Sequence, residues 1–88
     1  MTYRIDILPS AQRELAALPL RDRKRIDERI QALSGSPRPS GIKALQGQKG
    51  TYYRLRVGNY RVIYQVQDSV LVVLVVKIGD RKDVYRSL

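Results

Sequence analysis

The stretch 51–67 reads as two β-strands separated only by the dipeptide Gly58-Asn59. A glycine in the first central position suits a type II′ turn, which joins two antiparallel strands directly. A two-residue turn also fixes the pairing register, so that Arg56 faces Arg61 across the hairpin. Because side chains alternate between the two faces of a strand, this register predicts which residues lie together.

The predicted register gives the hairpin one apolar face and one cationic face. The apolar face, on which helices can pack, comprises Tyr53, Leu55, Val57, Tyr60, Val62 and Tyr64. The opposite face carries Arg54, Arg56 and Arg61, and no acidic residue lies within 51–67. Two interpretations are open: a solvated face with snorkelling arginines, or a site where three cations hold phosphates. The lack of neighbouring acids and of lysine favours the phosphate site.

The N-terminal part of the chain predicts one strand followed by two helices. Tyrosine and isoleucine alternate with charged residues over 3–7, a pattern typical of a half-buried strand. Apolar residues then recur at helical spacing over 9–34, with Ser10 as a candidate N-cap and Pro19 between the two helices. We therefore expect a helical hairpin after the first strand.

The C-terminal part predicts three strands, at 51–57, 60–67 and 70–78, with a second two-residue turn at 68–69. The last of these strands is apolar on both faces and is expected at the centre of the sheet. The segment 34–50 is rich in glycine, serine and proline and predicts the loosest part of the chain, although its apolar residues at 42–45 could dock on the core. This order predicts an α+β sandwich, with helices on one face of a mostly antiparallel sheet.

Length and composition restrict what such a domain can do. The 88 residues are enough for one small domain, expected to span 1–88, and they include no cysteine and no histidine. Catalysis by a thiolate or an imidazole is therefore excluded. The chain has 17 Lys and Arg against 8 Asp and Glu, a net charge of +9. A folded domain this basic is expected to bind a polyanion, an anionic membrane or an acidic protein.

The ends of the chain give no sign of export or membrane insertion. The N-terminus lacks the apolar core of a signal peptide, and the longest apolar run, 70–76, is far shorter than the roughly 20 residues that span a bilayer. We therefore expect a soluble, cytoplasmic protein.

The C-terminal stretch KIGDRKDVYRSL places Arg81 four residues before Tyr85. At this spacing the two side chains lie on the same face of a helix or of a strand. Alone, this pattern is more typical of a basic terminus whose tyrosine packs on the sheet edge than of a site.

Taken together, the order of elements, the stretch YYRLRVGNYRVIYQV and the ending GDRKDVYR resemble the RelE/ParE superfamily of type II toxins. The resemblance covers the chain from Tyr3 to Arg86 and is most specific at 52–66 and 79–86. RelE-like members are ribosome-dependent mRNA endoribonucleases, whereas ParE-like members inhibit DNA gyrase. Basic residues on the second strand, with an arginine and a tyrosine near the end, resemble the RelE side. The resemblance implies a small RelE-like sandwich that cleaves mRNA; the alternatives are a ParE-like gyrase inhibitor and a nucleic-acid-binding module without toxicity.

The resemblance also implies roles for particular residues. The implied catalytic residues are Arg61, Arg81 and Tyr85, and the implied RNA phosphate contacts are Arg54, Arg56, Lys82 and Arg86. Tyr85 would act as general base or as a stacking platform, and the arginines would stabilise the developing phosphate charge. No metal and no cofactor is expected.

Two departures from the family pattern bear on this assignment. Arg54 and Arg56 stand where the best-known RelE pattern has lysines, and an arginine cannot accept a proton in a protein. Asp80 stands directly before Arg81, where many relatives have a basic residue or histidine. The implied partners are the ribosome, mRNA and a cognate RelB-like antitoxin, expected to be acidic in its toxin-binding segment, in a prokaryotic cytoplasm and without a membrane.

Overall fold

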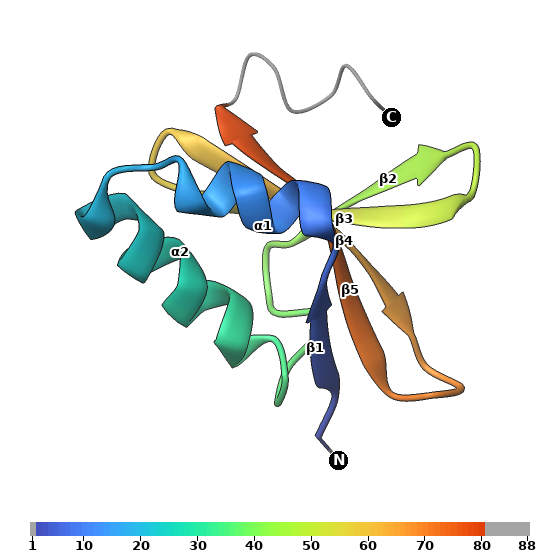
Figure 1. Cartoon of the computed structure of the whole chain (residues 1–88). Helices are drawn as coiled ribbons and strands as arrows, with labels where there is room; N and C mark the ends of the chain where they lie inside the picture. The colour runs from blue at the N-terminus through green and yellow to red at the C-terminus, as the bar shows by residue number, and fades with distance from the viewer. Residues whose placement is uncertain (1, 81–88) are drawn as a thin grey trace.

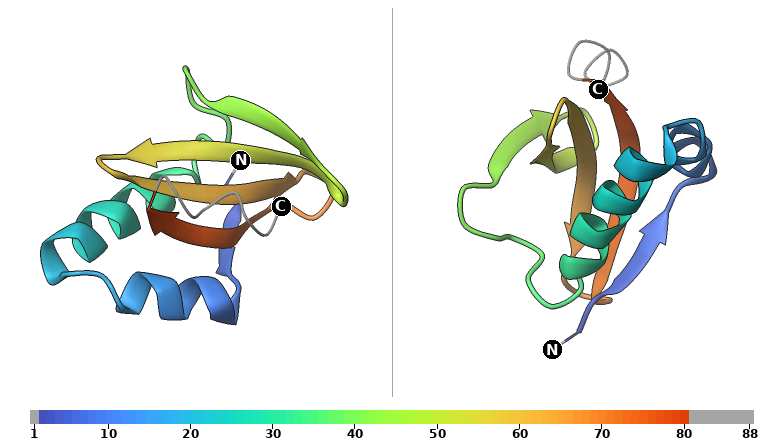
Figure 2. Two further views of the ribbon diagram at one scale, coloured as in Figure 1. Left: turned by 90° about the horizontal axis from the view of Figure 1, so that it is seen from above. Right: turned by 90° about the vertical axis from the view of Figure 1, so that its left-hand side faces the viewer.

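The structure is a computed structural model that describes residues 2–80 (Figure 1). Its elements are β1 (Arg4–Ile7), α1 (Pro9–Ala16), α2 (Leu20–Ala32), β2 (Lys43–Gly47), β3 (Gly50–Val57), β4 (Tyr60–Gln67) and β5 (Val72–Asp80). The strands form one five-stranded sheet in the order β1-β5-β4-β3-β2. Both helices lie on the same face of this sheet (Figure 2), so the predicted α+β architecture is confirmed.

The sheet is mixed rather than uniformly antiparallel. Strands β2, β3, β4 and β5 pair antiparallel in sequence, as predicted for the last three. Strand β1, by contrast, lies parallel to β5, with Arg4 opposite Val72. Parallel neighbours need a long connection, and the helices and the other strands between β1 and β5 supply it.

The hairpin of β3 and β4 has the predicted register, with Val57 opposite Tyr60 and Arg56 opposite Arg61. Gly58 has a φ of 59°, and no residue other than glycine in this turn has positive φ, which fits the type II′ geometry. The predicted apolar face is also confirmed, since its side chains are buried or pack against the core.

The core lies between this face and the two helices. Its buried residues are Ala11, Ile26, Ile30, Leu33, Leu55, Val57, Val62, Tyr64, Val73, Val75 and Ile78. Neither helix has a side-chain N-cap: α1 begins at Pro9 after Leu8, so the predicted cap at Ser10 is wrong, and α2 begins after Pro19. Proline at the first helical turn needs no amide partner, which explains how α1 starts without a cap. Within residues 2–80, neither helix is long and apolar enough to cross a membrane.

The prediction of a loose segment at 34–50 is wrong for its second half. Residues 43–47 form strand β2, which pairs with β3 from Lys43 opposite Arg54 to Gly47 opposite Gly50. Ile42 packs against the core, as expected, but the residues after it extend the sheet. The sequence of this short strand, KALQG, has no pattern typical of a strand, and its pairing with β3 holds it in the sheet.

The start of β5 also differs from the prediction. The strand begins at Val72 instead of residue 70, and a longer turn precedes it, with Leu71 at a φ of 55°. The two-residue turn expected at 68–69 is therefore wrong. Strand β5 lies inside the sheet, between β1 and β4, but the middle position belongs to β4.

Candidate anion-binding site

A cavity of about 340 Å³ lies beside the point where β2 begins, and we call it the basic pocket. Its lining comprises Arg29, Pro39, Ser40, Gly41, Ile42, Lys43, Arg54, Leu55 and Arg56. Four of these residues are cationic and none is acidic. Such a concave, single-sign surface concentrates anions, and guanidinium groups suit phosphate in particular.

The pocket exists because β2 is shorter than β3. Lys43, the first residue of β2, pairs with Arg54, and in the described part of the chain no strand pairs with this edge of β3 from Leu55 to Val57. Arg54 and Arg56 are two residues apart and so lie on the same face of β3. Helix α2 closes the opposite side through Arg29, which precedes the buried Ile30.

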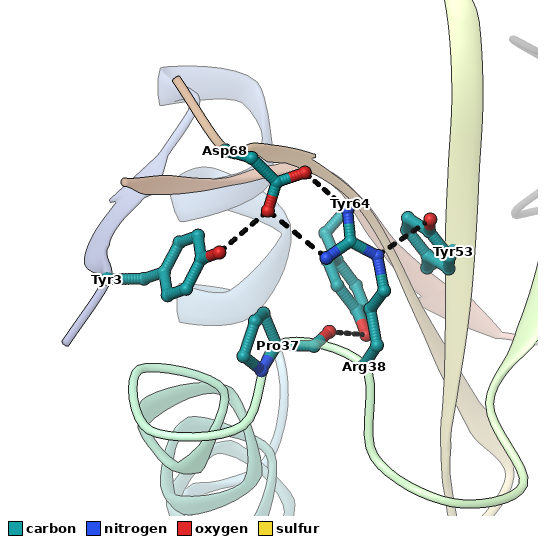
Figure 3. Close-up of polar contacts among 6 residues, drawn as sticks. All are labelled: Tyr3, Pro37, Arg38, Tyr53, Tyr64 and Asp68. Atoms are coloured by element: carbon teal, nitrogen blue, oxygen red, sulfur yellow. Dashed lines mark hydrogen bonds and ion pairs between the residues drawn. The ribbon is translucent and has the colours of Figure 1, made fainter. Parts of the chain in front are cut away.

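The loop that forms the remaining wall is anchored to the sheet by Arg38 (Figure 3). The Arg38 guanidinium donates two hydrogen bonds to Asp68, from Nη2 to Oδ2 at 2.7 Å and from Nη1 to Oδ1 at 3.2 Å. Its Nε donates to the hydroxyl of Tyr53 at 3.0 Å. A guanidinium that binds a carboxylate through two parallel bonds is held in a defined orientation.

Two tyrosine hydroxyls complete this clamp, as Figure 3 shows. Tyr3 donates to Oδ1 of Asp68 at 2.6 Å, and Tyr64 donates to the carbonyl oxygen of Pro37 at 2.8 Å. We call Tyr3, Arg38 and Asp68, with the tyrosines at 53 and 64, the loop clamp. It connects the residue before β1, the 34–42 loop, β3, β4 and the β4–β5 turn, and so holds residues 39–42 in place as one wall of the basic pocket.

The charges of the clamp reinforce one another. The hydrogen bonds from Arg38, and then from Tyr3, lower the pKa of Asp68 to about 2. Conversely, the hydrogen bond to Asp68 raises the pKa of Tyr3, and burial raises that of Tyr64 to about 12. The Asp68 carboxylate is therefore ionised at neutral pH and both tyrosines keep their protons, which is the state the hydrogen bonds require.

The structure separates the three arginines that the hairpin places on one face. Arg54 and Arg56 line the basic pocket, whereas Arg61 does not. The Arg61 side chain is only 7% exposed, and its Nη1 donates to the carbonyl oxygens of Tyr60 at 3.0 Å and Gly58 at 3.3 Å. Its guanidinium therefore lies against the turn of the hairpin and is not part of the pocket lining.

The remaining predicted site residues, Arg81, Lys82, Tyr85 and Arg86, lie outside the described residues. The sequence alone did not indicate two residues of the pocket, Arg29 and Lys43. Lys43 could have been found through its pairing with Arg54, but only if β2 had been predicted as a strand. Arg29 belongs to a helix with many exposed charges, and no sequence pattern distinguishes it from them.

Comparisons with known proteins agree with the fold and identify the family. The family model of the ParE toxin of type II toxin-antitoxin systems (parDE) matches residues 5–85. The chain is 33% identical over 88 residues to the mRNA interferase toxin RelE of Escherichia coli K12, covering 97% of this chain and 92% of that protein.

Two solved complexes contain a chain with the same fold. The archaeal RelE–RelB complex from Pyrococcus horikoshii OT3 superposes with a TM-score of 0.81 at 32% identity, covering 94% of this chain and 99% of that chain. The intact E. coli RelBE toxin–antitoxin complex gives a TM-score of 0.77 at 29% identity, covering 89% and 95%. The family model spans the superfamily, while the full-length relatives and the structures are RelE proteins. The chain therefore belongs to the RelE/ParE superfamily of type II toxins and is a RelE-like toxin.

Proposed function

We propose that this RelE-like toxin is a ribosome-dependent mRNA interferase, which cleaves mRNA in the ribosomal A site and so stops translation. The observation that carries the proposal is the basic pocket: among the described residues that line it, four are cationic and none is acidic. Two of the four, Arg54 and Arg56, stand at the positions of β3 where the family has basic residues. The similarity to a protein named mRNA interferase toxin RelE, over nearly the whole chain, supports the same activity.

The proposed reaction uses the RNA's own 2′-hydroxyl as nucleophile. The 2′-oxygen forms a bond to the adjacent phosphorus, the bond to the 5′-oxygen breaks, and the leaving oxygen takes up a proton from water. The products are a 2′,3′-cyclic phosphate and a 5′-hydroxyl end. Tyr85, as the phenolate that adjacent cations favour, would accept the 2′-hydroxyl proton. Arg81 would stabilise the negative charge on the phosphorane, and Arg61 would join it once its guanidinium leaves the carbonyl oxygens of the hairpin turn. Metal ions have no role in this scheme.

The basic pocket has a separate task in this mechanism. Arg54 and Arg56 would hold phosphates that flank the scissile bond, with Arg29 and Lys43 adding charge at the rim of the pocket. Phosphate contacts of this kind position the strand without reading its sequence. Lys82 and Arg86 are proposed to add further phosphate contacts.

Dependence on the ribosome follows from the weakness of the catalytic groups. A chain without histidine lacks the usual general base near pH 7. Turnover then depends on precise orientation of the mRNA, which the ribosome would supply. The net charge of +9 favours docking on ribosomal RNA, through contacts that weaken steeply as salt increases.

We further propose that a RelB-type antitoxin neutralises this protein. The solved structures from P. horikoshii and E. coli are complexes of a RelE chain with RelB. The strong positive charge of the present chain suits an antitoxin segment rich in acidic residues.

The proposal is tested by inducing the protein in a bacterium and mapping mRNA ends, for wild type and for Arg81→Ala and Tyr85→Phe. The expected result is translation-dependent cleavage that leaves 5′-hydroxyl ends and disappears in both variants. Cleavage with 5′-phosphate ends would overturn the mechanism. Growth arrest with intact mRNA and lost gyrase supercoiling would overturn the activity.

A further inference from the structure

A second cavity, of about 490 Å³, lies on the sheet face that carries Arg54 and Arg56. Its lining includes Lys49, Tyr52, Gln65, Leu74 and Val76, which come from the β2–β3 turn, β3, β4 and β5. We infer that this cavity is a nucleobase-binding pocket for single-stranded RNA, with Tyr52 as the stacking platform. The inference deepens the proposed function and rests on it for the identity of the RNA.

The position of Tyr52 relative to the basic pocket is the first support. Tyr52, Arg54 and Arg56 alternate along β3 and so lie in a row on one face, with consecutive members roughly 7 Å apart. A strand of RNA whose phosphates contact the arginines therefore has a neighbouring base within reach of Tyr52. Proteins that bind single-stranded nucleic acid commonly combine a positive groove with aromatic platforms in this way.

The second support is that the Tyr52 ring packs at a defined position on β2, which we call its seat. Tyr52 pairs with Leu45 of β2, and its ring lies over Gly47, where a Cβ atom would clash with the ring carbons Cε2 and Cδ2. Glycine at this position thus leaves room for the ring beside the backbone of β2. A platform that is already held in place loses little conformational entropy when a base stacks on it.

The third support is a polar group beside an apolar floor. Gln65 on β4 donates from Nε2 to the carbonyl oxygen of Lys49 at 3.1 Å, which orients its amide and leaves the amide oxygen to accept from a base N–H. Leu74 lies next to Gln65 on β5, and with Val76 it gives the cavity an apolar floor. Bases in single-stranded RNA are recognised by this combination of stacking and edge hydrogen bonds.

The charges around this cavity also fit RNA. Lys49 lies at its rim and contributes positive charge. Lys77, in contrast, pairs with Glu14 at 2.6 Å, so that charge is already satisfied within the fold. This cavity therefore binds a base, and most phosphate binding belongs to the basic pocket.

The direct test compares binding of a short oligouridylate with binding of a matched oligomer whose nucleotides are replaced by stable abasic spacers. Wild type is expected to prefer the oligomer with bases by about tenfold or more. Tyr52→Phe keeps the ring and should keep this preference, whereas Tyr52→Ala should lose it. Arg54→Ala is the matched control, because it should weaken both oligomers equally. Circular dichroism confirms that each variant is folded.

Cleavage on programmed ribosomes separates this inference from the proposed function. If wild type cleaves the mRNA and Tyr52→Ala changes which codons are cleaved, the result supports both the proposed function and the base-binding pocket. Wild type that fails to cleave but shows the Tyr52-dependent base preference contradicts the proposed function and supports the pocket. If Tyr52→Ala leaves both base preference and cleavage unchanged, the pocket is overturned while the function stands. The pocket is also overturned if Tyr52→Ala weakens antitoxin binding and leaves RNA binding intact, since the cavity would then hold a protein side chain.

Discussion

Lys43 lies directly opposite Arg54, at the end of the pairing between β2 and β3. Two cations face each other at the point where the sheet edge opens into the basic pocket, and Arg29 and Arg56 line the same cavity. Like charges at directly opposed positions are destabilising in a sheet. The arrangement gathers positive charge at the opening of the pocket, where it can attract an anion.

Replacing Lys43 should accordingly separate RNA binding from stability. We expect Lys43→Ala to weaken binding of single-stranded RNA several-fold and to lower the slope of log affinity against log salt by about 0.7, the value for one phosphate contact. The free energy of unfolding should change little, because Lys43 is an exposed residue. Fluorescence anisotropy across a salt series measures the slope. Arg21→Ala, which removes an exposed cation of α2 outside the pocket lining, is the control and should change the slope less.

Because of the loop clamp, replacing Arg38 should alter the basic pocket although Arg38 does not line it. Arg38→Ala removes both bonds to Asp68 and the bond to Tyr53, so residues 39–42 lose their anchor to the sheet. We expect faster amide hydrogen exchange in that loop and several-fold weaker RNA binding. Arg4→Ala, which removes another exposed arginine paired with an aspartate, should leave the loop protected. Unchanged loop exchange in Arg38→Ala would show that the clamp does not position the pocket.

The same clamp predicts a defined loss of stability in acid. The pKa of Asp68 is lowered from its ordinary value of 3.8 to about 2 in the folded protein. A carboxylate with a lowered pKa stabilises the fold above pH 4, and this contribution is lost as the pH falls toward 2. Urea unfolding from pH 6 to pH 2 should therefore show wild type more stable than Asp68→Asn above pH 4, with the difference shrinking below it. A difference that is constant over this range would contradict the lowered pKa.

The β3–β4 hairpin shows what a sequence can supply when its contacts are local. The two-residue turn at Gly58 sets the register, and the register correctly assigns Leu55 and Val62 to the core and Arg54 to the opposite face. Strand β2 could not be found in this way, because its order depends on β3 and its own five residues carry no alternation. The parallel position of β1 beside β5 is likewise a long-range pairing that no local pattern records.

Only the part of the candidate site that depends on these local contacts could be predicted from the sequence. Alternation places Arg54, Arg56 and Arg61 on one face, but it does not give the direction of a long side chain. The Arg61 guanidinium turns back to the hairpin turn, while Arg54 and Arg56 reach a cavity whose other walls come from α2 and the 39–42 loop. Arg29 and Lys43 join the site only through that tertiary arrangement.

Tyr64 offers a test of how much the clamp contributes to stability from the core side. Its ring is fully buried and stacks near Tyr53, with 5.6 Å between ring centroids, while its hydroxyl bonds the Pro37 carbonyl. Tyr64→Phe keeps the ring and removes only the hydroxyl. We expect a loss of about 0.5–1.5 kcal/mol in the free energy of unfolding, as for a single hydrogen bond. Denaturant unfolding measures this loss, and a variant as stable as wild type would show that the bond contributes nothing net.

Gly47→Ala tests the seat of Tyr52 without altering any polar group. The added Cβ cannot fit beside the Tyr52 ring in its present position, so the ring must move. Because Gly47 lies near the end of β2, next to the turn, the backbone itself should tolerate alanine and the fold should persist. We expect the variant to lose most of the preference for oligouridylate over the abasic oligomer while keeping the salt dependence that the arginines confer. Gly35→Ala is the control, since a Cβ there has nothing within 4 Å and should change neither property. Full base preference in a folded Gly47→Ala would mean that the seat of the Tyr52 ring does not govern stacking.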